Sequence, residues 1–183
     1  MPGTRSFQRR AARSILGFTL VELMVTIAIA GILLAVAVPS FNQLMVTNRL
    51  TAQANEMVAA MNFARSEAIK RNTRISFCRA SSSTATNCAA TAASWRNWIV
   101  TQGDGTVVRR GVVNTFEGGI SVQSTLTGDR VTFGADGLAR TGTAIITNQR
   151  ISICAPRDRA GRRVVLGAGS RLSTESYTGS CGA

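Results

Sequence analysis

The sequence predicts an α+β protein in which one long N-terminal helix packs on a C-terminal antiparallel β-region. Residues 18–38 form an unbroken apolar run, and apolar residues then recur every three or four positions up to about residue 71. From residue 73 onward, short β-prone segments alternate with glycine-containing turns. Hydrophobic residues make up 45% of the 183 residues, so the chain can bury a core of its own.

The apolar run is long enough to cross a membrane. It reads FTLVELMVTIAIAGILLAVAV, with Glu22 as its one charged residue. At about 1.5 Å per residue, a helix of this length spans a bilayer core of about 30 Å. A buried helix of a soluble core is the alternative, but the length of the run and its apolarity on every side favour a membrane span. The preceding flank carries arginines and no acid, which predicts a cytoplasmic N-terminus.

A processing signal lies before the apolar run. Cleavage after the run, as in an ordinary secretory signal, is disfavoured because Pro39 follows it. A basic leader and the hexapeptide GFTLVE at residues 17–22 precede it. In this register these features resemble the type III signal of type IV prepilins and type II secretion pseudopilins. The resemblance implies that prepilin peptidase cleaves after Gly17 and methylates the new amine of Phe18.

Glu22 and Pro39 are the expected assembly residues of this segment. A carboxylate inside a bilayer is costly and needs a partner. Cleavage would create an α-amine on Phe18, which lies four residues before Glu22 on the same helical face. In a filament, the Glu22 carboxylate can pair with the Phe18 amine of a neighbouring subunit; a glutamate that reaches the lipid headgroups is the alternative. Pro39 lacks a backbone donor and should bend the helix as it leaves the membrane.

The helical period continues beyond Pro39, which predicts one helix over about 18–71. Its methionines are expected in the core rather than at a cofactor. The apolar positions of this continuation are Phe41, Leu44, Met45, Leu50, Ala54, Met57, Val58, Met61 and Ala68. Strands are expected at 73–79, 95–101, 106–113, 120–126, 130–133, 144–147, 150–154 and 162–166. Turns are expected at 102–105, 127–129 and 134–137, and an irregular loop at 81–93.

The order of these elements resembles the GspH/FimT group of minor pilins and pseudopilins. Residues 62–72 resemble the segment that ends the long helix in that group, and Trp95, Trp98, residues 133–137 and Ile153-Cys154 fall where its β-region motifs are expected. The resemblance implies a type IV pilin-like fold and a structural subunit, at a tip or in initiation, of a type IV pilus or a type II secretion pseudopilus. The motifs do not separate the two machines.

The resemblance also implies a division of the chain and a set of partners. We expect a cleaved leader (1–17), a transmembrane and assembly helix (18–38), its amphipathic continuation (39–72) and a periplasmic β-rich domain (73–183). The expected partners are other major or minor pilins or pseudopilins and prepilin peptidase. Before assembly the chain is expected to cross the inner membrane once, with its C-terminal domain in the periplasm.

Four cysteines in an oxidising compartment predict disulfides, and they allow three pairings. Proximity in the sequence favours Cys78–Cys88, and Cys154–Cys181 would then tie the C-terminal tail to a strand. A Cys78–Cys154 pairing remains possible if those two strands are neighbours. No CxxC spacing occurs, so we expect no metal site.

The composition argues against an enzyme. The chain has no histidine, which removes the Ser-His-Asp and Cys-His catalytic arrangements. Its nine acidic residues are dispersed, with no close pair that resembles an acid/base dyad. Residues 167–170 lack the third glycine and the lysine of a phosphate loop, so a turn is expected there. We therefore expect neither catalysis nor a cofactor.

The arginine content supports a second hypothesis, binding of double-stranded DNA during natural transformation. The chain has a net charge of +12, and Lys70 is its one lysine. Some FimT-type pilins bind DNA through a Gly-Arg-x-Arg motif, of which Gly161-Arg162-Arg163-Val164 matches the first two positions and not the fourth. Guanidinium groups can engage successive phosphates. A solvated basic face is the alternative, favoured by the scarcity of lysine. The candidate residues are Arg157, Arg159, Arg162, Arg163 and Arg171.

Overall fold

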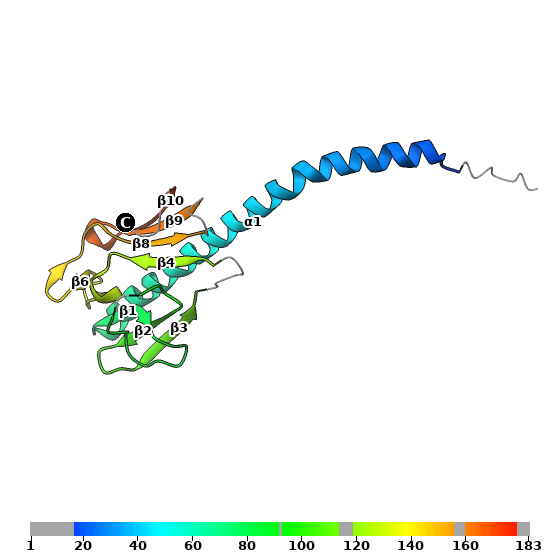
Figure 1. Ribbon diagram of the computed structural model, residues 1–183. Helices are drawn as coiled ribbons and strands as arrows, with labels where there is room; N and C mark the ends of the chain where they lie inside the picture. The colour runs from blue at the N-terminus through cyan, green and yellow to red at the C-terminus, as the bar shows by residue number, and fades with distance from the viewer. Residues whose placement is uncertain (1–16, 92, 114–118, 156–159, 179–183) are drawn as a thin grey trace, which may run out of the picture. The chain divides into compact units, whose positions relative to one another are not determined.

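The structure is a computed structural model that describes residues 17–91, 93–113, 119–155 and 160–178. The chain forms two compact units, Met1–Asn42 and Gln43–Ala183. The first contains the N-terminal part of one long helix, α1 (Leu20–Arg71), and the second contains the rest of α1 and two antiparallel sheets (Figure 1). The predicted fold class, a long helix with an antiparallel β-region, is confirmed.

Within the described residues, six strands form one sheet, sheet A, and four form a second, sheet B. In spatial order, sheet A contains β3 (Val107–Val112), β2 (Asn97–Gln102), β1 (Ile75–Ala80), β5 (Arg130–Phe133), β6 (Ala139–Thr141) and β7 (Ala144–Ile145). Sheet B contains β10 (Leu172–Tyr177), β9 (Gly161–Leu166), β8 (Gln149–Cys154) and β4 (Ser121–Ser124). Short 3₁₀ turns, η1 (Thr127–Asp129) and η3 (Ala168–Ser170), precede β5 and β10.

Each of the eight predicted strand segments overlaps an observed strand, and two observed strands were not predicted. β6 has three residues, and β10 reads LSTESY, so neither shows the apolar run or clear alternation that marks a strand. Both depend on pairing with a neighbour, since β6 pairs with β5 and β10 with β9. The predicted turns are present, and Gly105, Gly128 and Gly137 in them adopt positive φ.

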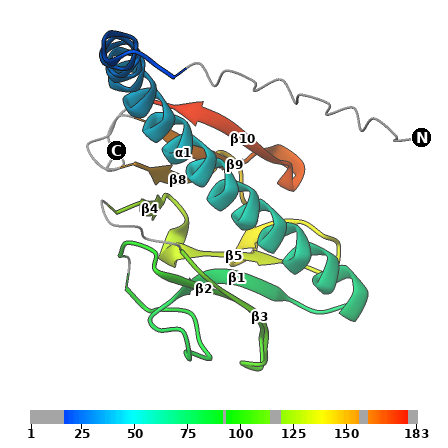
Figure 2. The ribbon, with the colours of Figure 1, turned by 90° about the vertical axis from the view of Figure 1, so that its right-hand side faces the viewer.

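The C-terminal part of α1 packs on both sheets. Its buried positions follow one stripe at three- and four-residue steps: Leu50, Gln53, Ala54, Met57, Ala60, Met61, Ala64, Glu67 and Ala68. Figure 2 shows this part of the helix crossing the two sheets, with β8, β9 and β10 in the upper part of the view and β1, β2 and β5 in the lower part. Phe41, Leu44 and Met45 were expected in the stripe but are 62%, 56% and 38% exposed, so the fully buried stripe begins only at Leu50.

One buried carboxylate joins the two sheets. Asp129 of η1 accepts hydrogen bonds from Arg79 Nε of β1 (3.1 Å), Trp95 Nε1 (3.2 Å) and Ser124 Oγ of β4 (2.5 Å). The backbone N–H of Ala93 also donates to it, at 3.2 Å. Arg79 and Asp129 are 7% and 4% exposed, so they form a buried ion pair. Because β1 belongs to sheet A and β4 to sheet B, Asp129 fixes one sheet to the other.

Candidate assembly segment and arginine surface

A side-chain cap marks the beginning of α1. The backbone N–H of Glu22 donates to Thr19 Oγ1 at 3.2 Å, which places Thr19 at the N-cap. Glu22 is the third residue of the helix, where a glutamate can complete a capping box. The cap seen here uses the backbone N–H of Glu22, so it does not assign a role to the Glu22 carboxylate. The Thr-x-x-Glu spacing at residues 19–22 is a sequence pattern typical of such a helix start.

The N-terminal part of α1 exposes its apolar side chains in every direction. From Phe18 to Phe41 the large apolar side chains are 51% to 82% exposed. By its length and composition, α1 contains a stretch able to cross a membrane. None of that stretch is buried by the described part of the chain, so it is not the core helix of this fold. Burying so much apolar surface requires lipid or other subunits.

Glu22 is the one charged side chain in this apolar stretch. Among the described residues, no cation lies within ion-pair distance of its carboxylate. Gly17 and Phe18, the predicted cleavage pair, are exposed. α1 continues through Pro39, so the predicted single helix is present across this residue. The roles of Gly17, Phe18, Glu22 and Pro39 in processing, pairing and bending stay predictions.

The structure does not bring the candidate DNA-binding arginines together. Arg157 and Arg159 lie outside the described residues. Arg162 and Arg163 are consecutive in β9, and Arg171 lies at the far end of the β9–β10 hairpin, next to the Leu166–Leu172 pair. Arg163 pairs with Glu175, four residues from Arg171, which at about 3.3 Å per residue is about 13 Å along the strand.

Arg162 and Arg163 project from opposite faces of sheet B, because consecutive strand residues alternate. Arg162 shares its face with the buried Val164; its Nε donates to Thr51 Oγ1 of α1 at 3.2 Å and its Nη1 to Ser176 Oγ at 2.6 Å. The guanidinium of Arg163 lies over the ring of Tyr177, 3.3 Å from its centroid. Arg162 is thus held against the helix, and Arg163 is held against an aromatic side chain.

Gly161 has a packing role beside these arginines. A Cβ at this position would lie 3.0 Å from Tyr177 Cδ1 and 3.2 Å from the Ile153 carbonyl oxygen. The glycine therefore leaves room for the tyrosine ring on which Arg163 stacks. The Gly-Arg-Arg sequence is explained by packing at all three positions, which weakens the resemblance to a DNA-binding motif.

Both partners of one of the two expected disulfides lie within the described residues. Cys78 of β1 and Cys88 are bridged, with Cα atoms 5.6 Å apart. Cys154 is also disulfide-bonded, while its expected partner, Cys181, lies outside the described residues, so that pairing stays a prediction. The Cys78–Cys154 alternative is excluded by the first bridge. Among the described residues, no cluster of His, Cys, Asp and Glu could hold a metal ion.

The N-terminal segment and the fold are each similar to those of known proteins. Residues 13–38 match the prokaryotic N-terminal methylation motif. The type IV minor pilin FimU of Pseudomonas aeruginosa PAO1 shares the fold in two crystal forms. Form P2₁ has a TM-score of 0.55 at 19% identity, covering 72% of this chain and 92% of FimU. Form P6₅ has a TM-score of 0.52 at 20% identity, covering 69% and 92%. The chain has a type IV pilin-like fold behind an N-terminal methylation motif.

Residues 53–170 match the family described as type II transport protein GspH. The chain belongs to the GspH family. No curated protein matches it. Members of this family are structural, non-enzymatic subunits, so the chain is a structural subunit of a pilus or a pseudopilus.

Proposed function

We propose that the chain is a minor subunit, at the tip or in initiation, that enters its filament through the exposed apolar half of α1. The observation that carries the proposal is the stretch from Phe18 to Phe41, whose large side chains no described residue covers. Prepilin peptidase cleaves between Gly17 and Phe18, and the apolar stretch is retained. The new amine of Phe18 then pairs with the Glu22 carboxylate of a neighbour.

Glu22→Gln is the sharpest test of this pairing. Glutamine is as compatible as glutamate with the third position of a capped helix but carries no charge, so a defect of the variant reports the lost charge. We expect the variant to be cleaved and membrane-inserted like the wild type, yet nearly absent from sheared filaments. Glu22→Asp, which keeps the charge on a shorter side chain, is the matched control. Normal incorporation of Glu22→Gln would refute the pairing.

The machine and the position in the filament need a genetic test. The family description names type II transport, while the solved structures that share the fold are of a type IV minor pilin. We propose to delete the gene and to assay piliation, protein secretion and DNA uptake separately. Loss of piliation or of secretion identifies the machine. Quantitative mass spectrometry of the filaments should find the chain far below the major subunit; equal abundance would refute a minor role.

The charge of the C-terminal part favours a second candidate function, the binding of double-stranded DNA. From Arg140 onward the chain has seven arginines and two acidic residues, a net charge of +5. Arg163 and Arg171 are the described candidates that no hydrogen bond ties to the helix. If these side chains contact phosphates, Arg163→Gln/Arg171→Gln should reduce the slope of log K against log salt by about 1–2.

A charge-matched variant provides the control for this experiment. Arg74→Gln/Arg96→Gln removes the same charge from exposed positions of the β-region. The full-length protein in detergent is titrated with two unrelated duplexes. Equal weakening by both double variants would show bulk electrostatics rather than a site, and the absence of DNA binding at low salt would remove this function altogether.

A further inference from the structure

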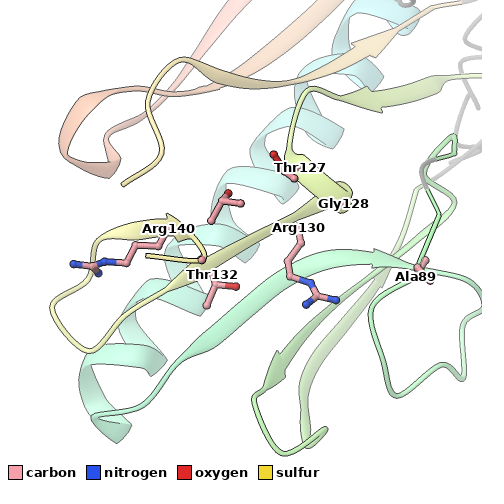
Figure 3. Close-up of a pocket in the computed structure, with 9 residues that line it drawn as sticks. Ala89, Thr127, Gly128, Arg130, Thr132 and Arg140 are labelled. Carbon is pink, nitrogen blue, oxygen red and sulfur yellow. The ribbon is translucent and has the colours of Figure 1, made fainter. Parts of the chain in front are cut away.

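A cavity of about 350 Å³ opens on sheet A, lined by the strand residues that alternate with its buried core residues. Four segments line it: the chain after the disulfide, η1, β5 and the β6–β7 region. Its side chains are almost all polar or positively charged: Arg130, Arg140, Thr127, Thr132 and Thr141, with Ala89 on one wall. In Figure 3 the side chain of Arg130 extends from β5 toward the side of Ala89, whereas Arg140 extends the other way.

The two arginines of the cavity differ in charge balance. Arg140 Nη1 and Nη2 donate to the two Asp136 carboxylate oxygens at 2.7 and 2.5 Å. This pairing lowers the pKa of Asp136 from 3.8 to about 2, so the carboxylate is ionised and neutralises Arg140 at neutral pH. Among the described residues, no carboxylate pairs with Arg130, and no acidic residue lines the cavity. Of the two guanidinium charges in the cavity, that of Arg130 is thus not compensated by any described carboxylate.

The wall opposite Arg130 is fixed in the folded protein. Cys78 lies directly across from Arg130 in the β1–β5 pairing, and the disulfide leads from Cys78 to Cys88. The next residue, Ala89, donates its backbone N–H to the Arg79 carbonyl of β1 at 2.8 Å. The chain after the disulfide is thus held beside Arg130, so a ligand there would not need to order this wall.

We propose that this cavity binds a single carboxylate group, which Arg130 holds through its planar guanidinium. Two parallel N–H groups of arginine match the two oxygens of a carboxylate, and the threonine hydroxyls around it can donate further hydrogen bonds. The single uncompensated charge matches a monoanion, whereas a phosphate dianion would require a second cation, and Asp136 already occupies Arg140. The carboxylate is either a free small acid or the acidic side chain of another subunit.

Titration of the full-length protein in detergent with acetate tests the binding. Acetamide serves as the uncharged isostere and sodium chloride as the ionic-strength control. By NMR we expect a saturable shift of the Arg130 Nε–H signal, with a dissociation constant on the order of millimolar. Arg130→Gln should weaken binding at least about tenfold, and Arg130→Lys, which keeps the charge without the fork, should weaken it less. Arg74→Gln, at an exposed position outside the cavity, should bind like the wild type.

The proposal is overturned if acetate causes no saturable shift, if acetamide or chloride causes the same shift, or if Arg130→Gln binds as tightly as the wild type. Filament incorporation of Arg130→Gln distinguishes the two sources, and this part alone rests on the proposed assembly function. Reduced incorporation relative to Arg74→Gln identifies an acidic side chain of another subunit; unchanged incorporation identifies a free carboxylate. Failure of acetate binding leaves the outcome for Glu22→Gln unaffected, so the two proposals fail separately.

Discussion

The N-terminal half of α1 and the globular unit each contain a carboxylate in apolar surroundings, but they treat it differently. Asp129 is buried and receives hydrogen bonds from Arg79, Trp95, Ser124 and the backbone of Ala93. Glu22 lies in an apolar helix without a cation among the described residues. A charge in such surroundings requires a partner. The globular unit supplies that partner within the chain, whereas the described residues supply none for Glu22, for which we propose a partner in a neighbouring subunit.

The largest expected effect comes from Asp129→Asn. The variant leaves the buried Arg79 without its counter-charge, so we expect a loss of about 3–5 kcal/mol in the free energy of unfolding. Denaturant unfolding in detergent, followed by tryptophan fluorescence, measures it. Glu22→Gln should leave the same unfolding curve unchanged, because no described residue of the globular unit forms an ion pair with Glu22. A loss below about 1 kcal/mol for Asp129→Asn, as at ordinary exposed sites, would contradict the comparison.

Core truncation compares the two halves of the helix itself. Met57 is fully buried, whereas Leu33 is 65% exposed. We expect Met57→Ala to lower the free energy of unfolding by about 2–5 kcal/mol, since it leaves a cavity between α1 and the sheets. Leu33→Ala should not change it, although it removes apolar surface from the assembly segment. Equal effects in the unfolding assay would show that the N-terminal half of α1 has partners within the globular unit.

The Cys78–Cys88 disulfide makes a smaller contribution to the free energy of unfolding, and this contribution lies within the subunit. The bridge closes a loop across a sequence separation of 10 residues. On the chain-entropy model, Cys78→Ala/Cys88→Ala should cost about 2–3 kcal/mol in unfolding free energy. Filament incorporation of the variant at low temperature should be normal, because the assembly helix does not depend on the loop. Lost incorporation of the folded variant would place the loop in a subunit interface.

The smallest expected effect is the change in stability at low pH that comes from the Asp136–Arg140 pair. The pKa of Asp136 is about 2 in the folded protein instead of 3.8, because the guanidinium of Arg140 and the backbone of Leu138 donate hydrogen bonds to it. A lowered carboxyl pKa contributes stability above pH 3.8, and this contribution is lost as the pH falls from about 4 to about 2. Arg140→Gln should raise the NMR titration midpoint of Asp136 toward 3.8. An unchanged midpoint would show that the backbone hydrogen bond alone lowers the pKa.

The sequence predicts the elements whose signals are local. The apolar run of α1 and the glycine-containing turns between strands are each marked by residues that are adjacent in the sequence. All of these elements are present in the structure. β10 was not predicted because it is a polar edge strand, which becomes ordered only through its pairing with β9. The contacts of Asp129 with Arg79, Ala93 and Trp95 join residues that lie 34 to 50 positions apart, and no local pattern reveals them.

For the candidate DNA-binding arginines, by contrast, the sequence already contained the signal that Arg162 and Arg163 do not form one cluster. Residues 162–166 were predicted as a strand, and the period of two already places Arg162 and Arg163 on opposite faces. A cluster of both could not have been expected from that strand. The cavity at Arg130 has no corresponding signal in the sequence, because its walls come from four segments that only the fold brings together.

The edges of the two sheets limit how the protein can associate through its strands. An exposed strand edge invites another strand to add to it, which produces uncontrolled aggregation. Here the edge strand β7 has two residues, β4 has four, β3 carries the exposed Arg109 and Arg110, and β10 carries Glu175. Short or charged edges are poor templates for strand addition. A pilus or pseudopilus subunit with such edges offers few sites for strand addition, so its entry into a filament does not compete with β-aggregation.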